Sequence, residues 1–437
     1  MKYEWILNII RIVFILSLLF ISSKYIFIYE YSISNKRKLE DINIYSEITV
    51  TIDANDSFIN ENFTPQPYVE YGENNDIIMR WNETILDCSY MFFNTSIETI
   101  DLSNFDTSKV TSMEYMFKDC SNLNYFNLKN NNLSNLKSMK GIFINCINLD
   151  NITFENIDFN ELTSLNEMFN NSLINNIELI NLNFKKLTSF EKAFSNINSL
   201  KTIQLTNITA SELISMEEMF SNCSNLENAT FINFEANNLR NLKKMFDYCS
   251  ILRYIKLDGI LENINISKIE TMENMFNNCS GIINFTLENI TFLELTNMKN
   301  LFKKSNIKNL IFRNLFFPNL ILMTPLINQS EYRYQYNCLS ITFENINIPN
   351  VITFEELFSS YCLGNIIFNN ITIPKVKSFF KMFYFQFTYD PSNYNITIEN
   401  IYVPNVEKIN YMIYCTPSNY NFFLVQNLKI YIFQNYN

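Results

Sequence analysis

Met113-Glu114-Tyr115-Met116-Phe117-Lys118-Asp119-Cys120 is the stretch that decides the fold. Its Met-x-x-Met-Phe pattern returns along the chain, with the slot of Phe117 at positions 92, 117, 143, 169, 194, 220, 246, 276, 302, 327, 358, 383 and 413. Successive slots are 25 or 26 residues apart, with excursions to 30 or 31. Because a unit of this size cannot bury its apolar face alone, the period predicts a solenoid of about 13 stacked coils. We therefore expect function on a repeated surface rather than in a pocket.

The apolar residues of this block are spaced for a short helix. Met113, Met116, Phe117 and Cys120 stand at i, i+3, i+4 and i+7, which places them on one helical face. The same slots hold Met216, Met219, Phe220 and Cys223 in one later coil, and Met272, Met275, Phe276 and Cys279 in another. We expect this face to be core rather than a cofactor site.

A strand pattern follows each block. Leu123, Phe126 and Leu128 alternate with polar residues, and the same alternation recurs at Leu200, Ile203 and Leu205. Equivalent strands one repeat apart must run parallel. The expected fold class is an α/β solenoid, a curved stack over residues 85–437 with a parallel sheet on one face and short helices on the other.

Asparagine closes most of these strands. It stands two residues after the last apolar strand position, with Gly259 as the exception, at Asn104, Asn130, Asn156, Asn181, Asn207, Asn233, Asn289, Asn314, Asn345, Asn370 and Asn400. Asn and Gly share a tolerance of positive φ, so this slot is predicted to turn the chain out of the strand. An inward side chain could also bond the backbone of the adjacent coil. Asn207, Asn289 and Asn370 lie in Asn-x-Thr sequons, which should carry no glycan if the slot is buried.

Residues 101–123, Asp101-Leu102-Ser103-Asn104-Phe105-Asp106 through Met113 to Leu123, carry a family resemblance. This unit closely resembles the repeat of BspA-like leucine-rich-repeat surface proteins, the DUF285 type. The resemblance implies a secreted or cell-surface solenoid for adhesion or host contact, and it supplies no catalytic residues. Longer coils and the strand-closing prolines of the C-terminal half, such as Pro318 and Pro349, depart from the regular pattern.

Composition argues against most enzyme classes and against nucleic-acid binding. The chain has no histidine, only 5 glycines and a formal charge of −11. Histidine-based catalysis and glycine-rich phosphate loops are therefore excluded, and no basic face is evident. Asp258 and Glu288 could in principle catalyse as paired acids, but only within a cleft. We expect no enzyme, no cofactor and no metal.

The cysteines follow the repeat. Cys120, Cys146, Cys223, Cys249 and Cys279 share one apolar slot, which favours small buried hydrophobic residues. Cross-coil disulfides such as Cys120 with Cys146 are the alternative in an oxidising compartment. Zinc-ligand spacings are absent.

The N-terminus predicts export. Residues 1–30 contain the apolar run Ile12 to Ile21, typical of a cleaved signal peptide or, if Trp5 to Tyr29 stays intact, of a membrane anchor. Residues 31–84 are expected to form a linker and an N-terminal cap. Both readings send the repeats through the secretory pathway to the cell surface or beyond, although the basic residues Lys36, Arg37 and Lys38 would favour the opposite topology for an anchored chain. On the exported chain, sequons such as Asn62, Asn82 and Asn94 would make a glycoprotein.

Strand positions that alternate with the core should face solvent and offer an extended binding surface. The candidate residues of this ligand face are Tyr125, Tyr254, Lys256, Asp258, Glu288, Arg313 and Glu344. The charges could pair internally, bind a polar partner or hold a cation. The leading hypothesis is a secreted or surface-tethered solenoid that binds an extracellular protein or glycan through its sheet face. The alternative is a structural coat protein without a specific ligand.

Overall fold

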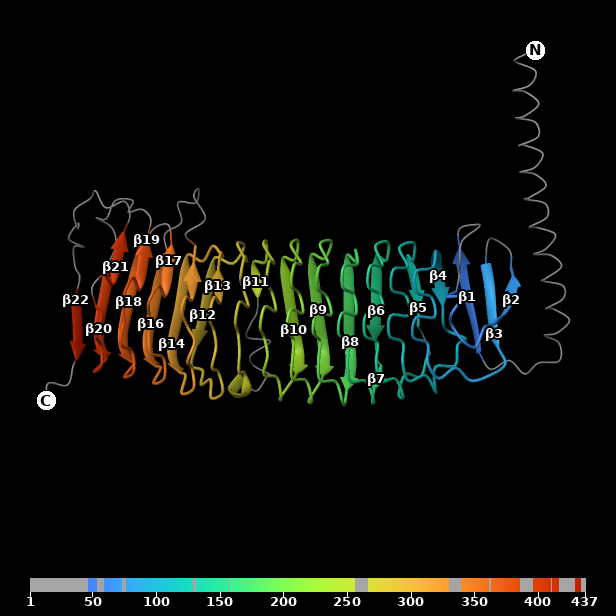
Figure 1. Cartoon of the computed structure of the whole chain (residues 1–437), viewed down its shortest axis with the longest axis horizontal. Helices are drawn as coiled ribbons and strands as arrows, with labels where there is room; N and C mark the ends of the chain where they lie inside the picture. The colour runs from blue at the N-terminus through green and yellow to red at the C-terminus, as the bar shows by residue number, and fades with distance from the viewer. Residues whose placement is uncertain are drawn as a thin grey trace, which may run out of the picture.

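The computed structural model describes residues 46–52, 59–72, 76–128, 131–155, 157–255, 266–329, 339–360, 363–385, 396–409, 411–415 and 429–433. These residues form a parallel β-solenoid of about 10 turns, with the coils side by side along one long axis (Figure 1). Some coils of the expected 13 include residues outside the described ranges. The expected signal peptide or anchor at residues 1–30 also lies outside them. Among the described residues no helix has the length and apolar character that crossing a membrane requires.

The N-terminal end of the stack carries an antiparallel unit. Strands β1 (Ser46–Ile52), β2 (Tyr68–Tyr71) and β3 (Asp76–Trp81) pair in the order β2-β3-β1. β1 also pairs antiparallel with β4 (Ile97–Asp101), the first strand of the parallel series, and β4 pairs parallel with β5 (Tyr125–Asn127). The outer edge of β4 is therefore covered by a strand of opposite direction. This unit lies within residues 31–84, where the sequence predicts a cap.

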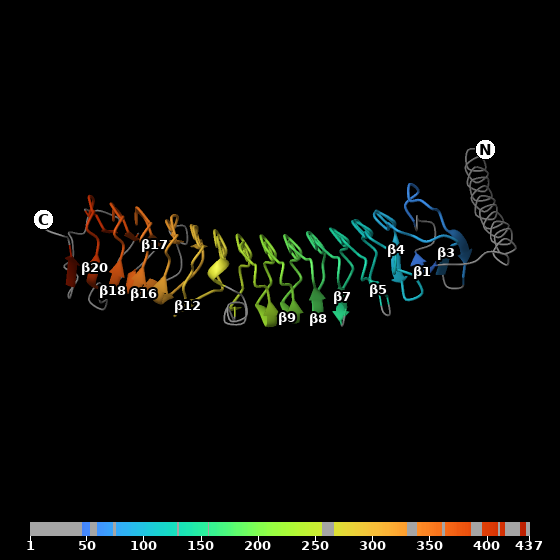
Figure 2. The same cartoon turned by 90° about the horizontal axis from the view of Figure 1, so that it is seen from below.

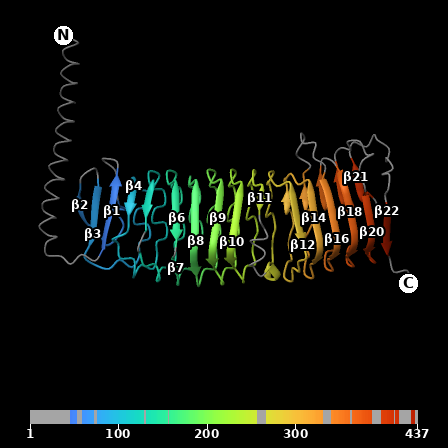
Figure 3. The same ribbon diagram turned by 180° about the vertical axis from the view of Figure 1, so that it is seen from behind.

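The remaining main strands continue the parallel series in two sheets. The first has the order β11-β10-β9-β8-β6 with β7 beside β8, and comprises β6 (Asn151–Glu155), β7 (Asp158–Phe159), β8 (Asn176–Phe184), β9 (Thr202–Thr209), β10 (Asn228–Glu235) and β11 (Tyr254–Ile255). The second comprises β12 (Asn284–Glu288), β14 (Asn309–Phe316), β16 (Leu339–Asn347), β18 (Leu363–Thr372), β20 (Ile396–Tyr402) and β22 (Lys429–Phe433). Seen from behind, the strands of these sheets stand side by side along the stack (Figure 3).

The opposite side of the coil is made of turns, so the expected short helices are wrong. Met116 N–H bonds Met113 C=O and Cys120 N–H bonds Phe117 C=O, while Tyr115 N–H and Phe117 N–H reach Lys140 C=O and Ile142 C=O of the next coil. A helix would use these donors internally. Left-handed backbone at Tyr115 (φ 54°) and Asp119 (φ 63°) makes two successive turns instead. Because these turns also place residues i, i+3, i+4 and i+7 inward, the inward residues are those expected.

The α/β and leucine-rich-repeat-like class is therefore corrected to a parallel β-solenoid. The single helical element among the described residues is the 3-10 turn η1 (Ile266–Lys268). In the C-terminal coils the turn side straightens into a sheet of its own, made of short parallel strands. These are β13 (Phe302–Lys303), β15 (Ile327–Asn328), β17 (Phe358–Ser360), β19 (Phe383–Phe385) and β21 (Ile413–Cys415). Seen edge-on, each coil is a narrow loop between the two sides (Figure 2).

A stack of phenylalanine rings fills the interior. Phe92, Phe117, Phe143, Phe169, Phe194, Phe220, Phe246, Phe276 and Phe302 are fully buried. Neighbouring rings lie 5.3 to 5.7 Å apart between centroids, with interplanar angles of 2 to 17°. This separation is slightly more than the spacing of adjacent strands, about 4.8 Å, so the rings can stack only where the coils are in register.

The asparagine row has the predicted positive φ, but it does not end most of the strands: β9, for example, continues from Asn207 to Thr209. Its side chains also differ from the prediction. Positive φ, between 50 and 58°, is found at Asn181, Asn207, Asn233, Asn289, Asn314, Asn345, Asn370 and Asn400. These side chains are exposed rather than inward. They form hydrogen bonds with one another: the Nδ2 atoms of Asn207 and Asn233 each donate to Oδ1 of the preceding asparagine, at a distance of 2.8 Å. Asn104 lies in a turn without positive φ, and Asn130, Asn156 and Gly259 fall outside the described residues.

Replacement of Phe220 by alanine should lower the stability of the fold severely. The ring stacks on Phe194 and Phe246, so its loss leaves a cavity open to two coils. We expect a loss of about 3 to 5 kcal/mol in the free energy of unfolding, followed through the denaturant midpoint. Tyr125→Ala, at an exposed aromatic residue, is the control and should change it by less than about 0.5 kcal/mol. Equal midpoints for the two variants would contradict a stacked core.

Replacement of Asn233 separates backbone from side-chain effects. In Asn233→Ala the residue at φ 50° keeps a β-carbon but loses the polar side chain that makes this conformation acceptable for asparagine. The strain should cost about 1 to 2 kcal/mol in the free energy of unfolding. Asn233→Gly keeps that conformation and loses only the bond to Asn207. Chemical denaturation should therefore rank the variants as parent, glycine, alanine in falling stability. An alanine variant as stable as the parent would refute the conformational role of this slot.

Candidate interaction surface

The outer face of the C-terminal sheet brings three predicted charged residues together. Strand register places Glu288 beside Arg313 and Arg313 beside Glu344 on β12, β14 and β16. The Arg313 guanidinium bonds Glu344 through Nε at 2.6 Å and Glu288 through Nη1 at 3.2 Å. The bond to Glu344 raises the pKa of Arg313, so the arginine is charged under all ordinary conditions. The three side chains form one partly exposed group of net charge −1.

The neighbouring row on the same face is built of β-branched residues. Thr286, Ile311, Thr342, Ile367 and Thr397 stand side by side on β12, β14, β16, β18 and β20. Asn309 donates through Nδ2 to Oδ1 of Asn284 in the next row, at 2.6 Å. The face is therefore a flat polar surface with one charged row along its edge.

The two tyrosines predicted for the ligand face do not join this group. Tyr125 begins β5 and is 53% exposed, and Tyr254 begins β11, so β6, β8, β9 and β10 lie between the two tyrosines. Lys256 and Asp258 fall outside the described residues. Of the five candidates that the structure describes, Glu288, Arg313 and Glu344 form a cluster, and the two tyrosines lie on other strands of the stack.

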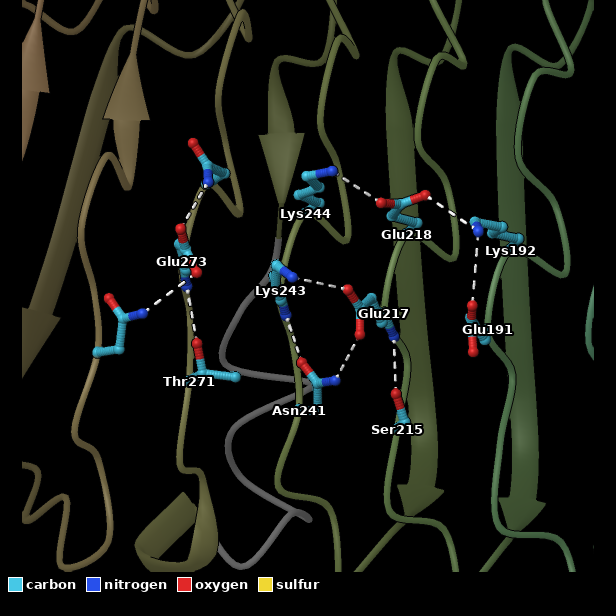
Figure 4. A network of polar contacts seen from close by, with 12 residues as sticks. Glu191, Lys192, Ser215, Glu217, Glu218, Asn241, Lys243, Lys244, Thr271 and Glu273 are labelled. Carbon is cyan, nitrogen blue, oxygen red and sulfur yellow. Dashed lines mark hydrogen bonds and ion pairs between the residues drawn. The ribbon is translucent and has the colours of Figure 1, made fainter.

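The turn side carries a second charged surface that the hydrophobic pattern does not indicate. Glu218 accepts from Lys244 at 2.9 Å and lies 3.7 Å from Lys192, so three successive coils are linked (Figure 4). Beside them Lys243 pairs with Glu217 at 3.1 Å. These residues occupy the two positions between the methionine slots of each coil. The alternation of Glu and Lys at those positions in successive coils is the sequence signal that could have identified them.

Small polar side chains hold the turn side in shape. The residue before the first methionine slot accepts the N–H two residues later, as Ser215 does from Glu217 at 3.2 Å and Asn241 from Lys243 at 3.0 Å (Figure 4). The same bond recurs at Ser112, Ser138, Ser164, Ser189, Thr271, Asn297, Thr353 and Ser378. Each bond satisfies a backbone donor at the entry to the turns.

An aromatic and basic cluster lies on the turn side near the N-terminal end. The rings of Tyr90 and Tyr115 lie 5.1 Å apart, and the Nζ atoms of Lys118 and Lys140 stand 5.6 and 5.7 Å from the Tyr115 centroid. Gly141 makes room for the Tyr115 ring, since a β-carbon there would lie 2.5 Å from it. Tyrosines at one slot in consecutive coils, followed by one of the few glycines, are the sequence signal for this cluster.

The described cysteines are unsuited to nucleophilic or metal chemistry. Cys88, Cys120, Cys146, Cys223, Cys249 and Cys279 are free and buried, as the apolar slot predicts. Burial raises the pKa of Cys120 to about 11 and that of Cys223 to about 12. The Cys223 thiol donates to Phe194 C=O of the preceding coil at 2.9 Å. Within the described ranges no group of three or more Cys, Asp or Glu residues is arranged to hold a metal ion.

A comparison with known families assigns the chain. The family model described as "Mycoplasma protein of unknown function, DUF285" matches residues 66–182 and 188–312, more than half of the chain. The chain belongs to the DUF285 family. The DUF285 match covers β12 but ends just before Arg313. The chain has no significant match among curated proteins or among solved structures.

Asp247 is a buried acid that the sequence does not single out. It is the next residue in the sequence after Phe246, whose ring belongs to the stack, and it is 7% exposed. Its Oδ1 accepts from Nδ2 of Asn277 at 2.7 Å. Desolvation raises the pKa of Asp247 to about 6 even though Lys244 and Asn277 favour the charged form. The folded chain therefore keeps a proton on Asp247 at pH values where the unfolded chain has lost it.

Asp247→Asn should change the pH dependence of stability. Between about pH 4 and 6 the folded state binds the Asp247 proton and the unfolded state does not, so stability falls as the pH rises through this window. The variant removes that fall and should be more stable than the parent above pH 6, by at most about 3 kcal/mol, with the difference vanishing near pH 4. Denaturant midpoints across pH 4 to 8 measure it.

Asp106→Asn is the matched control for this experiment. The hydrogen bond from Ser108 lowers the pKa of the exposed Asp106 carboxyl, so its contribution is present at neutral pH and is lost as the pH falls. Its variant should therefore lose stability at neutral pH instead of gaining it. Parallel profiles for parent and Asp247→Asn would show that Asp247 has an ordinary pKa.

Proposed function

We propose that this chain is a non-catalytic recognition solenoid, secreted or held at the cell surface, that binds an extracellular protein or glycan through the outer face of β12, β14, β16, β18 and β20. The observation that carries the proposal is the contrast between the two sides of these strands. The inward rows repeat bulky apolar residues, whereas the outward rows change from acidic to basic and from Thr to Ile between neighbours. A rigid frame with varied exposed side chains is suited to recognising one partner.

The Glu288–Arg313–Glu344 group is the proposed centre of this face. Arg313 presents a planar donor fork that its two glutamates hold in place, so it is ordered before a partner arrives. The adjacent Thr and Ile row supplies a flat surface that contacts either a protein or a sugar ring. Binding would use shape and hydrogen bonds more than net charge, because Arg313 offsets one of the two glutamate charges and leaves the group at −1.

Two further features support an extracellular role. The resemblance of residues 101–123 to BspA-like repeats, together with a stack of about 10 turns, is in keeping with a long adhesive surface. The apolar run from Ile12 to Ile21 would direct the chain into the secretory route, with cleavage or with retention as a membrane tether. Exposed sequons at Asn62, Asn82 and Asn94 are the proposed glycan positions.

The alternative is a structural coat protein, which the turn side favours. The linked charges of Lys192, Glu218 and Lys244 form a repeating polar ladder along the stack, and such a ladder would suit lateral packing of many copies. Solution scattering over a concentration series distinguishes the two functions. A rod of constant mass favours recognition, and open-ended growth with concentration favours the coat.

Arg313→Ala should weaken attachment of the purified full chain to cultured cells or to arrayed glycans. A central arginine of an interface contributes enough for a loss of about tenfold or more. Lys186→Ala is the control, because Lys186 is an exposed cation paired with Glu161 at 2.7 Å in another row. Both variants should keep the parent's denaturant midpoint. Equal attachment by the two variants would exclude the β12–β20 face as the binding surface.

A further inference from the structure

One exposed row runs along the corner between the strand side and the turn side. It consists of the residue two positions before the first methionine slot, and in the C-terminal coils it reads Arg240, Glu270, Thr296, Ile321, Ile352, Lys377 and Glu407. Backbone bonds join most neighbours, for example Thr296 N–H to Glu270 C=O at 2.9 Å and Lys377 N–H to Ile352 C=O at 2.9 Å. The pairing of Ile327 with Phe358 keeps the Ile321 and Ile352 coils in register. We call these residues the corner row.

The middle of the corner row is apolar and open to solvent. Ile321 is 54% exposed and Ile352 is 58% exposed. Leu322, beside Ile321, is 50% exposed and occupies the slot in which the neighbouring coils carry Asn297 and Thr353. Three large aliphatic side chains therefore meet solvent together on two adjacent coils. Such a patch with a polar rim is typical of an interface.

Ion pairs flank this patch on both sides along the axis. Arg240 Nη1 lies 2.6 Å from Glu270 Oε1, and Lys377 Nζ lies 3.0 Å from Glu407 Oε1. The sign order is the same at both ends, cation first and anion second. Residues at equal distances before and after Ile321 therefore carry opposite charges. Arg240 stands three coils before Ile321 and Glu407 three coils after it, while Glu270 stands two coils before and Lys377 two coils after.

We infer that the corner row is the contact surface for a second copy of this chain, which lies antiparallel on a twofold axis through Ile321. The axis brings Arg240 opposite Glu407 of the other copy and Glu270 opposite Lys377. Ile321 meets Ile321, and Ile352 meets Thr296. Each ion pair of one copy thus completes a four-charge group with a pair of the other copy, and the apolar patch is covered by its own image.

The charge pattern favours a second copy over other occupants. An axis midway between Ile321 and Ile352 would place Glu270 opposite Glu407, so among the axes that cover the apolar patch only the one through Ile321 matches opposite charges. A lipid surface would be attracted by cations alone, whereas this row is balanced. Lys268 and Lys375, two positions earlier in their coils, would face each other across the same axis, but each donates to an amide of its own chain, Asn238 and Asn350.

This inference is independent of the proposed ligand face, which uses other rows. The twofold pairing is also closed, so it yields a dimer of fixed mass and not an open lateral array. The dimer leaves the Glu288–Arg313–Glu344 group in place, and Arg313→Ala should not alter the oligomeric state. Each of the two proposals can therefore be refuted while the other one stands.

Sedimentation of the full chain in the micromolar range tests the dimer. The parent should sediment as a dimer, and Lys377→Glu should lose at least tenfold in dimer affinity because it would face Glu270 of the other copy. Lys186→Glu creates the same like-charge contact with Glu161 within one chain, in coils that precede the paired segment from Arg240 to Glu407, and should stay dimeric. The double variant Glu270→Lys with Lys377→Glu should recover the dimer. A monomeric parent, or loss in both lysine variants, would overturn the proposal.

Cysteine cross-linking tests the position of the axis. Ile321→Cys meets its own copy and should form a covalent dimer on mild oxidation, visible on a non-reducing gel. Ile352→Cys alone should not cross-link, but a mixture of the Ile352→Cys and Thr296→Cys variants should. The parent under the same oxidation is the control for native thiols. Cross-linking of Ile352→Cys as fast as Ile321→Cys, or no cross-link in Ile321→Cys, would refute the twofold axis.

Discussion

Ring stacking between consecutive coils is the interaction on which the rest of the structure depends. From Phe92 to Phe302 the buried rings lie almost parallel at a nearly constant separation. A coil displaced by one residue would turn its phenylalanine and its alternating strand residues outward together. The stack therefore fixes the register of both sides at once. The outer rows, including the charged ones, inherit their alignment from this interior constraint.

Left-handed backbone positions make such a narrow coil possible. A helix would consume its own N–H groups, whereas the two successive turns at Tyr115 and Asp119 leave alternate donors for the next coil. The asparagine within the strand bends the chain at positive φ at another point of the coil. The chain achieves this with very few glycines, so it accepts a small conformational cost in most coils and offsets it with hydrogen bonds between coils.

The sequence predicts the features that depend on which residues are buried. It does not predict backbone geometry or polar contacts that leave the pattern of apolar residues unchanged. The period, the inward side chains of Met113 and Phe117, positive φ at asparagines such as Asn207, and the meeting of Glu288, Arg313 and Glu344 all follow from repeat position. A helix and a pair of turns place residues inward at the same spacing, so the apolar pattern cannot separate them. The Lys192–Glu218–Lys244 group and Asp247 occupy slots between the apolar ones, and the apolar pattern carries no information about the residues at those slots.

The asparagine ladder gives the molecule a direction. The amide nitrogens of Asn207 and Asn233 donate to the preceding coil, and Oδ1 of Asn207 accepts from Asn233 of the following one. Carboxamide dipoles arranged in this way add instead of cancelling. One end of the stack thus differs electrically from the other for reasons unrelated to the ionised side chains. Two molecules joined head to tail would sum these moments, while in a pair aligned in opposite senses the two moments would cancel.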